Sequence, residues 1–315
     1  MNLSAIFIQT LNTTLPVFAL VFVGIAMRRA GWVDDRFVSA ASKIVFKGSM
    51  PALIFVSIVG ADLSEAIRPG MLAYFGLGTL VSFIVIWAWA IWRVPHHQRG
   101  VYTQGAFRGN CGIMGLALAQ NMYGDFGLSA GSVLVGEVIL IYNVLAVIVL
   151  TWYQPGESAD WRSISRGVIT NPLIVATLAS IAVAASGLPM PAWLMTSGDY
   201  FAQLTLPLAL ICIGGALSVR ALYEARGVAL SASVIKMTIV PGVAVVGGWL
   251  LGFAPRELGL MFLYFACPTA AASFIMVEAM GGDAKLAANI VALTTLMASL
   301  TMTAGVFVLK ATGVI

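Results

Sequence analysis

Long apolar stretches separated by short polar segments run through the whole chain. An α-helix needs about 20 apolar residues to cross a bilayer, and most of these stretches reach that length. The pattern predicts an all-α membrane protein with ten transmembrane helices, at residues 4–28, 37–59, 70–92, 100–123, 128–152, 167–187, 199–219, 229–252, 256–280 and 284–309. The longest connection, from Tyr153 to Arg166, lies between two halves of five spans each.

Glycine and proline positions recur between the two halves. The matches are Pro16, Gly31 and Pro51 with Pro172, Gly187 and Pro207, 156 residues later, and Gly124-Asp125 with Gly282-Asp283, 158 residues later. Several matches in register indicate an internal duplication, and an odd number of spans per half inverts the second copy. We therefore predict a five-helix repeat at 1–152, a cytoplasmic link at 153–166 and an inverted repeat at 167–315. Such repeats are typical of secondary transporters, whose site lies at the midplane between them.

Composition excludes an ordinary soluble domain. Of the 315 residues, 60% are hydrophobic and 10% are charged, and the mean hydropathy is +0.96. A typical globular domain carries about 25% charged residues. This chain lacks the polar surface that such a domain would need.

Basic residues alternate between loops. One set of loop positions holds Arg28, Arg29, Arg36, Arg93, Arg99, Arg162, Arg166, Arg220, Arg226 and Lys285, and the other holds Arg68, Arg256 and Lys310. By the positive-inside rule the larger set is cytoplasmic, which predicts a multi-pass protein of the plasma (bacterial inner) membrane with both termini on the outer, periplasmic side. The net charge of +4 follows from this topology and calls for no nucleic-acid partner.

Two predicted spans are interrupted at equivalent positions. Four glycines fall within eleven residues at 105–115, beside Arg108 and Asn110, and the 158-residue offset places Pro268 opposite Asn110. Each glycine weakens a helix by about 1 kcal/mol relative to alanine, and a proline forces a kink or an opening. Irregular backbone at membrane depth must be buried or line a wet cavity. The two breaks therefore predict the transport site; packing kinks are the alternative.

The candidate substrate-binding residues surround these breaks. They are Arg108, Gly109, Asn110, Cys111, Gly112, Cys267, Pro268, Thr269 and Ser273. Arg108 matches a carboxylate through its planar fork of donors, and the helices that restart after the breaks would direct positive N-terminal ends at the same place. We expect Cys111 and Cys267 to line the ligand cavity, with apolar packing as the alternative.

Other charged residues lie within the predicted spans. Arg108 can instead form a structural pair with Glu137, which is also the deep carboxylate placed for a proton-coupling role. We expect the lysines to extend to the membrane interface and the remaining glutamate to reach the inner surface. These residues are Lys43, Lys47, Lys236 and Glu278.

The residues around the two breaks carry a family resemblance. The chain resembles the bacterial branch of the auxin efflux carrier family, within the group that includes the bile-acid/sodium symporters. The matching segments are residues 110–116, Pro268, Ser273 and 281–283, with Pro51 and Pro207 in two other spans; Ala117 stands where the family often has proline.

The resemblance implies an architecture and a movement. Spans four and nine would cross as an X. A mobile domain of spans three to five and eight to ten would move like an elevator against a scaffold of spans one, two, six and seven. The scaffold is typically the homodimer contact in such relatives.

These observations predict a secondary active transporter of a small organic anion, a mono- or dicarboxylate, with no cofactor and with protons or sodium as the coupling ion. A polytopic membrane enzyme is an alternative class, as is a channel or sensor without alternating access. An enzyme would need clustered catalytic groups. The adjacent Asp34 and Asp35 face no second acidic cluster, and both histidines, His96 and His97, share one loop.

Overall fold

The computed structural model describes residues 16, 19–60, 69–154, 162, 165–166, 169–188, 190–216 and 226–315. Within them the chain is helical, and its one β-type pairing is an isolated bridge. The elements are α2 (Asp35–Ile44), η1 (Val45–Ser49), α3 (Met50–Val59), α4 (Pro69–Arg93), η2 (His96–Gln98), α5 (Arg99–Phe107), η3 (Cys111–Gly115), α6 (Leu116–Trp152), α8 (Pro172–Ser186), α9 (Ala192–Ala202), α10 (Thr205–Ala216), α12 (Arg226–Val234), η4 (Ile235–Ile239), α13 (Val240–Leu250), α14 (Pro255–Phe265), α15 (Ala271–Ala279) and α16 (Ala284–Ala311).

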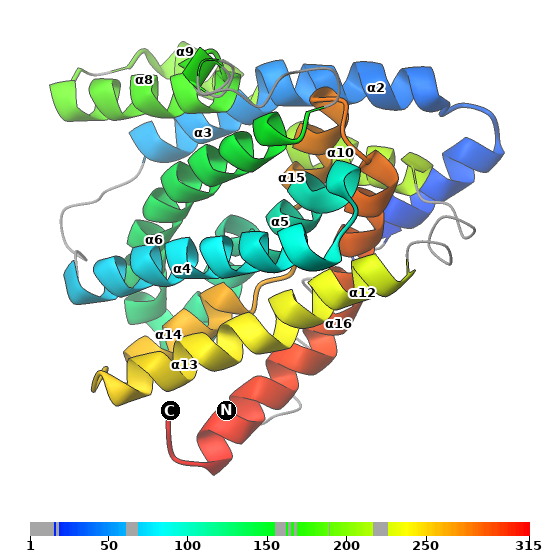
Figure 1. The fold of residues 1–315 in the computed structure, drawn as a ribbon. Coiled ribbons are helices and arrows are strands. Elements are labelled where there is room, and N and C mark those ends of the chain that lie inside the picture. Colours follow the sequence, from blue (N-terminus) through cyan, green and yellow to red (C-terminus); the bar gives the residue numbers. More distant parts are fainter. Residues whose placement is uncertain are drawn as a thin grey trace.

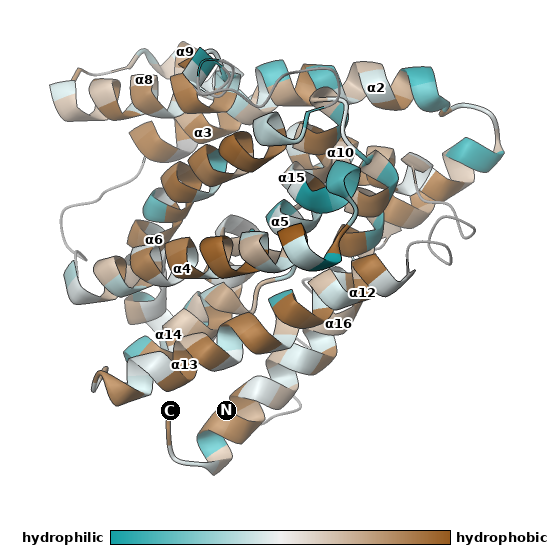
Figure 2. Ribbon diagram, in the orientation of Figure 1, coloured by the Kyte–Doolittle hydropathy of each residue, from teal (hydrophilic) through white to brown (hydrophobic). Residues whose placement is uncertain are grey.

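Six helical segments in this part of the chain are long and apolar enough to cross a membrane. They are Asp35–Val56, Pro69–Arg93, Ser129–Trp152, Ala192–Ala216, Gly227–Leu250 and Ala284–Ala311. Apolar residues predominate along most helices in Figure 2. The chain is therefore a multi-pass membrane protein, as its composition indicates.

The other predicted spans differ from these six for visible reasons. Spans 100–123 and 256–280 contain helices that stop and restart, and span 167–187 corresponds to the shorter apolar helix α8. Most of span 4–28 lies outside the described residues. Spans four and five are separated by a kink at Gly124, where a φ of 58° suits a residue without Cβ. The ten-helix inverted repeat stays a prediction.

One predicted boundary is wrong. The seventh span was expected to begin at residue 199, but the helical segment begins at Ala192, directly after Pro191. Proline fixes φ and lacks an N–H group, so it suits the start of a helix. Polar residues such as Ser197 and Asp199 lower the local hydropathy and hide this helix from an apolar pattern.

Two π-helical turns precede prolines inside long helices. Segment η1 ends two residues before Pro51, and η4 ends two residues before Pro241. A proline cannot donate to the helical ladder, and its ring clashes with the carbonyl group four residues earlier. That carbonyl belongs to Lys47 or Met237, which lie within the widened turns, so the helices continue through both prolines.

The helices pack in two groups. In the first, α3 lies against α8 and α9, and α2 lies against α10. In the second, α5 contacts α4 and α6, while α12 contacts α5 and α16. Figure 1 shows α2, α3, α8 and α9 side by side at the top of the view, with α4, α5, α12 and α13 below them. The groups meet where α15 packs on α2 and α10 and where α6 packs on α8.

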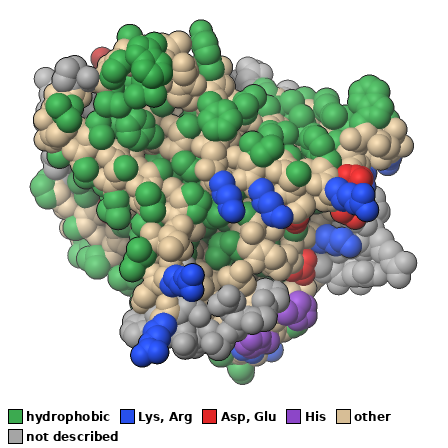
Figure 3. Space-filling model, turned by 90° about the horizontal axis from the view of Figure 1, so that it is seen from above, with side chains coloured by type: hydrophobic (Ala, Val, Ile, Leu, Met, Phe, Trp, Pro, Cys, Tyr) green, Lys and Arg blue, Asp and Glu red, His purple; other side chains and the backbone are tan. Residues whose placement is uncertain are grey.

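The exterior is apolar in the manner of a lipid-facing surface. Hydrophobic side chains cover much of the face in Figure 3, and Lys and Arg side chains lie below the largest apolar area. Exposed apolar residues of α8 and α9 include Val175, Leu178, Trp193 and Leu194. An exterior with many exposed apolar side chains suits the hydrocarbon of a bilayer.

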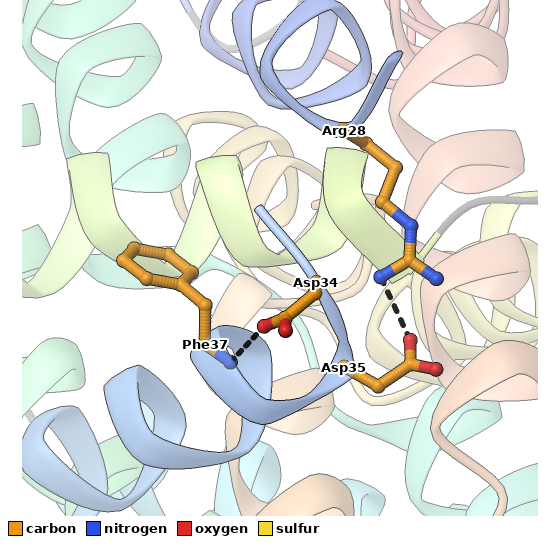
Figure 4. A network of polar contacts seen from close by, with 4 residues as sticks. All are labelled: Arg28, Asp34, Asp35 and Phe37. Atoms are coloured by element: carbon orange, nitrogen blue, oxygen red, sulfur yellow. Dashed lines mark hydrogen bonds and ion pairs between the residues drawn. The ribbon is translucent and has the colours of Figure 1, made fainter. Parts of the chain in front are cut away.

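The acidic pair considered for an enzyme has a structural role. Asp34 caps α2 by accepting a hydrogen bond from the Phe37 amide at 2.7 Å, and Asp35 forms an ion pair with Arg28 at 2.8 Å. Figure 4 shows the two carboxylates turned toward different partners. The pair therefore fixes the connection into α2.

Candidate functional site

The two interrupted helices cross at their breaks. Helix α5 ends at Phe107, and Arg108 continues in extended backbone with φ −83° and ψ 114°. The Asn110 amide donates to the Pro268 carbonyl at 2.8 Å, and Gly109 and Thr269 form an antiparallel bridge. Pro268 has no N–H group to return the bond. The Asn110 carbonyl accepts instead from the Met114 amide, at 3.1 Å.

Side chains satisfy the opened backbone on the α14–α15 side. The Thr269 amide donates to Thr294 Oγ1 at 3.1 Å, and the Thr269 hydroxyl donates to the Gly105 carbonyl at 2.7 Å. Thr269 is buried. It therefore ties the break to α5 and α16, as buried polar groups require partners.

Arg108 is buried, and no carboxylate of the described residues is its partner. Its Nη2 donates to Asn143 Oδ1 at 2.8 Å, and its Nη1 lies 2.6 Å from Met276 Sδ. Within the described residues the one ion pair is Arg28–Asp35, so the alternative pairing of Arg108 with Glu137 is not the arrangement found. Both contacts of the guanidinium are neutral, and its charge is not compensated by them.

Glu137 stands apart from the guanidinium. Its Oε2 is buried without a hydrogen-bond partner. Its Oε1 lies close to α4, where a Cβ on Gly76 would come within 2.5 Å of it. The glycine makes room for the carboxylate against α4.

The expectation for Lys236 is wrong. This side chain was expected to extend to the interface, but it is fully buried and its Nζ donates to the Phe265 carbonyl at 2.9 Å. It sits in the π-helical turn η4, which packs on α5 and α16. Lys43 and Lys47 are exposed, and their extension to the interface stays a prediction.

A cavity of about 1290 Å³ lies against the crossover. Its walls come from α3, α8 and α10 on one side and from α4, α6 and the two breaks on the other. Of the predicted site residues, it is lined by Arg108, Gly109, Asn110, Cys111, Gly112 and Glu137. These residues, predicted from two separate features of the chain, therefore share one space.

The remaining predicted residues do not line this cavity. Cys267 is fully buried and donates to the Leu263 carbonyl at 3.2 Å, so the expectation that both cysteines line the cavity fails for Cys267. Pro268 and Thr269 form the crossover backbone behind the wall, and Ser273 is buried. Residues 270–272 line the cavity in their place.

Sequence reasoning missed the polar face of α6. The cavity is lined by Asp125, Ser129, Ser132, Gly136, Tyr142 and Asn143. The first four recur at intervals of three and four residues, the spacing of one helix face. That stripe of small and polar residues within an apolar span was the available signal. Met276, which contacts Arg108, gave none.

Comparisons with known proteins agree with a transport role. A sequence model of the family described as "Membrane transport protein" matches residues 10–305. An uncharacterized transporter of Methanocaldococcus jannaschii is 23% identical over 295 residues, covering 90% of this chain and 94% of that protein. The uncharacterized transporter YfdV of Escherichia coli K12 is 22% identical, covering 88% and 91%. A Rhizobium meliloti protein named "Putative malonate transporter" is 24% identical, covering 94% of each chain.

The family match spans both interrupted helices and almost the whole chain. It confirms the resemblance to auxin efflux carriers that the residues of the two breaks carry. This chain belongs to the membrane transport protein family, that of the auxin efflux carriers, and its relatives include bacterial transporters.

Proposed function

We propose that this protein is a secondary active transporter of a small organic anion, a mono- or dicarboxylate, and that it works by elevator-like alternating access. The observation that carries the proposal is the guanidinium of Arg108. It lines a large cavity at the crossing of two interrupted helices and has only neutral contacts among the described residues.

The charge of Arg108 supports an anionic ligand. A charged side chain at membrane depth costs at least about 2.5 kcal/mol, and a carboxylate in the cavity would offset that cost. An arginine carries five N–H donors in a planar fork. Asn143 and Met276 each take up one of these donors, so the guanidinium retains N–H donors for a carboxylate.

Helix ends add to this preference. Segment η3, which continues into α6, begins at Cys111, and α15 begins at Ala271; both residues line the cavity. The first amide groups of a helix have no partner within the helix and carry partial positive charge. With Arg108 between them, they form a site suited to a carboxylate.

The packing on the two sides of the crossover supports alternating access. On one side α15 packs against α2 and α10. On the other side the cavity separates the two helix groups and reaches Gly60, Leu72 and Asp125. In the predicted topology these three residues are at the outer end, so the conformation would be open to the outside.

The two helix groups suggest the moving parts. We assign α4–α6 and α12–α16, which hold the crossover, to the mobile domain. The predicted first span would form the scaffold together with α2, α3 and α8–α10. The exposed apolar surface of these helices would hold a second copy in a homodimer. Glu137 lines the cavity with an unpartnered oxygen and is our candidate for proton coupling.

Counterflow in proteoliposomes tests the function. Vesicles preloaded with unlabelled malonate should accumulate labelled malonate, and a panel of mono- and dicarboxylates should compete. A channel would equilibrate the label without trans-stimulation, and an enzyme would convert it. Either of those results, or no uptake of any carboxylate, would reject the carrier proposal.

A further inference from the structure

Lys236 is a second buried cation at the crossover, and the carboxylate site just described does not include it. Its side chain has no exposed surface. Its ammonium group lies behind Gly109, because a Cβ placed on that glycine would come within 3.1 Å of Nζ. Gly109 lines the cavity. One glycine without a side chain therefore separates the ammonium group from the ligand space.

The charge of Lys236 has no acidic partner in the described part of the chain. Lys236 Nζ donates a hydrogen bond to the Phe265 carbonyl at 2.9 Å. The ion pair found among the described residues joins Arg28 to Asp35 and does not involve Lys236. Arg108, the residue before Gly109, also has only neutral hydrogen-bond partners. The crossover thus holds two buried basic side chains, and neither forms an ion pair with a carboxylate of the described residues.

The ammonium group lies at the C-terminal end of α14. Phe265 is the last residue of α14, and the final carbonyl groups of a helix carry partial negative charge. In transporters with interrupted helices, such carbonyl ends and unwound backbone coordinate the coupling cation. Here the group at that end of α14 is the ammonium group of a side chain, Lys236.

The second interrupted helix shows that this lysine is not a symmetric feature. Phe107 ends α5 and is the 158-residue counterpart of Phe265. The counterparts of Lys236 at offsets of 156 to 158 residues are residues 78–80, Gly-Thr-Leu, which carry no charge. A residue needed only to close a helix end would be expected at both ends.

We propose that Lys236 is a resident cation of the crossover, which takes the place of a metal coupling ion and selects a dicarboxylate dianion. The inference rests on the proposed carboxylate transport. Arg108 grips one carboxylate directly, and Lys236 raises the positive potential of the cavity through Gly109 without touching the ligand. Lys236 is thus a positioning and specificity residue, and the anion binds without sodium.

The first arm of the test uses the unmodified protein. Purified protein in detergent is titrated with malonate, a dianion, in buffers whose cation is either sodium or N-methylglucamine. The malonate Kd should agree within about twofold between the two buffers. A Kd that is tenfold weaker without sodium would overturn the inference, whereas the proposed carboxylate transport would still stand.

The second arm separates charge from structure. Lys236→Met should weaken malonate binding at least tenfold and propionate, a monocarboxylate of similar size, less than threefold. Lys236→Arg, which keeps the charge, should bind malonate within about threefold of the original protein. Equal losses for both ligands in Lys236→Met would show a purely structural role and reject the inference.

Failure of the proposed function looks different. In that case neither malonate nor propionate binds the unmodified protein in either buffer, and both proposals fall together. If Lys236→Met does not fold, the sodium comparison and the Lys236→Arg variant still decide the question. Sodium dependence of malonate binding to the unmodified protein counts against a resident cation. Loss of the dianion preference in Lys236→Arg does so as well.

Discussion

The hydroxyl of Thr205 donates a hydrogen bond to Ser49 Oγ at 2.9 Å, and the two residues are 156 positions apart. The same spacing separates Pro51 from Pro207. Residues related by a two-fold axis can bond to each other only if they lie close to that axis. Thr205 also lines the cavity, so such an axis would pass beside the cavity wall.

A second pair has the same property. Asn110 donates to Pro268, its counterpart 158 positions later, and Asn110 lines the cavity as well. An axis through both pairs would run across the cavity and relate the two halves of the chain. The two contacts support the proposed inverted repeat, in which the substrate binds between the copies.

The Thr205–Ser49 bond should be measurable as a coupling energy. Thr205→Val and Ser49→Ala should each destabilise the protein, and a double-mutant cycle should give a coupling of about 0.6 kcal/mol, the average for interhelical bonds in membranes. Unfolding in mixed micelles provides the measurement. Ser233, whose hydroxyl bonds within its own helix to the Ala229 carbonyl at 2.8 Å, is the control, and Ser233→Ala should not couple to Thr205→Val.

Replacement of Arg108 by lysine should abolish most transport although the charge remains. Lysine offers a point charge in place of the planar fork, and loss of charge-assisted bonds worth about 1.5 to 3 kcal/mol corresponds to roughly a 10- to 150-fold rise in KM. Uptake into liposomes at several substrate concentrations measures this change in KM. Glu137→Gln in the same chain is the control, because it should not restore uptake; restoration would mean that the two residues act as a pair.

Gly109→Ala should damage the site more than its size suggests. The new Cβ would lie 3.1 Å from Lys236 Nζ and 3.2 Å from Cys267 Cβ, so we expect a loss of about 1 to 3 kcal/mol from overpacking and weaker transport. Gly136→Ala is the matched control, since Gly136 also lines the cavity but a Cβ there meets nothing within 4 Å. That change should stabilise the helix by about 0.5 to 1 kcal/mol. Thermal unfolding in detergent compares the two, and equal effects would refute the close packing.

The predicted orientation can be read from the two ends of α8. Ile169 precedes the helix and Leu188 follows it, and their side chains are 71% and 66% exposed. In intact cells Leu188→Cys should react with an impermeant thiol reagent, and Ile169→Cys only after permeabilisation. The native cysteines, Cys111, Cys212 and Cys267, are buried and should give a low background. The reverse pattern would invert the assignment of the basic loops.

The sequence could predict the features that are marked by repeated glycine and proline positions or by interruptions of an apolar span. The breaks at Asn110 and Pro268 were visible because glycine and proline weaken any helix, whatever its neighbours. The prediction for Lys236 was wrong because a lysine within an apolar span can either extend to the membrane interface or be buried among helices. Only the packing of η4 on α5 decides between these two positions. Asn143 and Met276 became site residues through a tertiary contact with Arg108, which no spacing along the chain encodes.

Pro268→Ala should impair transport more than folding. The Pro268 carbonyl accepts from the Asn110 amide across the crossover, while the absence of an N–H group keeps α14 and α15 apart. Alanine favours a continuous helix over residues 266–270. The helix start at residues 270–272, which line the cavity, would then no longer present free amide groups to the ligand. Helical backbone at 268 would also turn its carbonyl away from Asn110.

We expect uptake by Pro268→Ala to fall at least tenfold while the thermal unfolding temperature stays within a few degrees. Pro172→Ala, in the first turn of α8, where a proline removes no helical hydrogen bond, is the control and should leave uptake unchanged. Normal uptake by Pro268→Ala would mean that the ligand does not bind at the crossover.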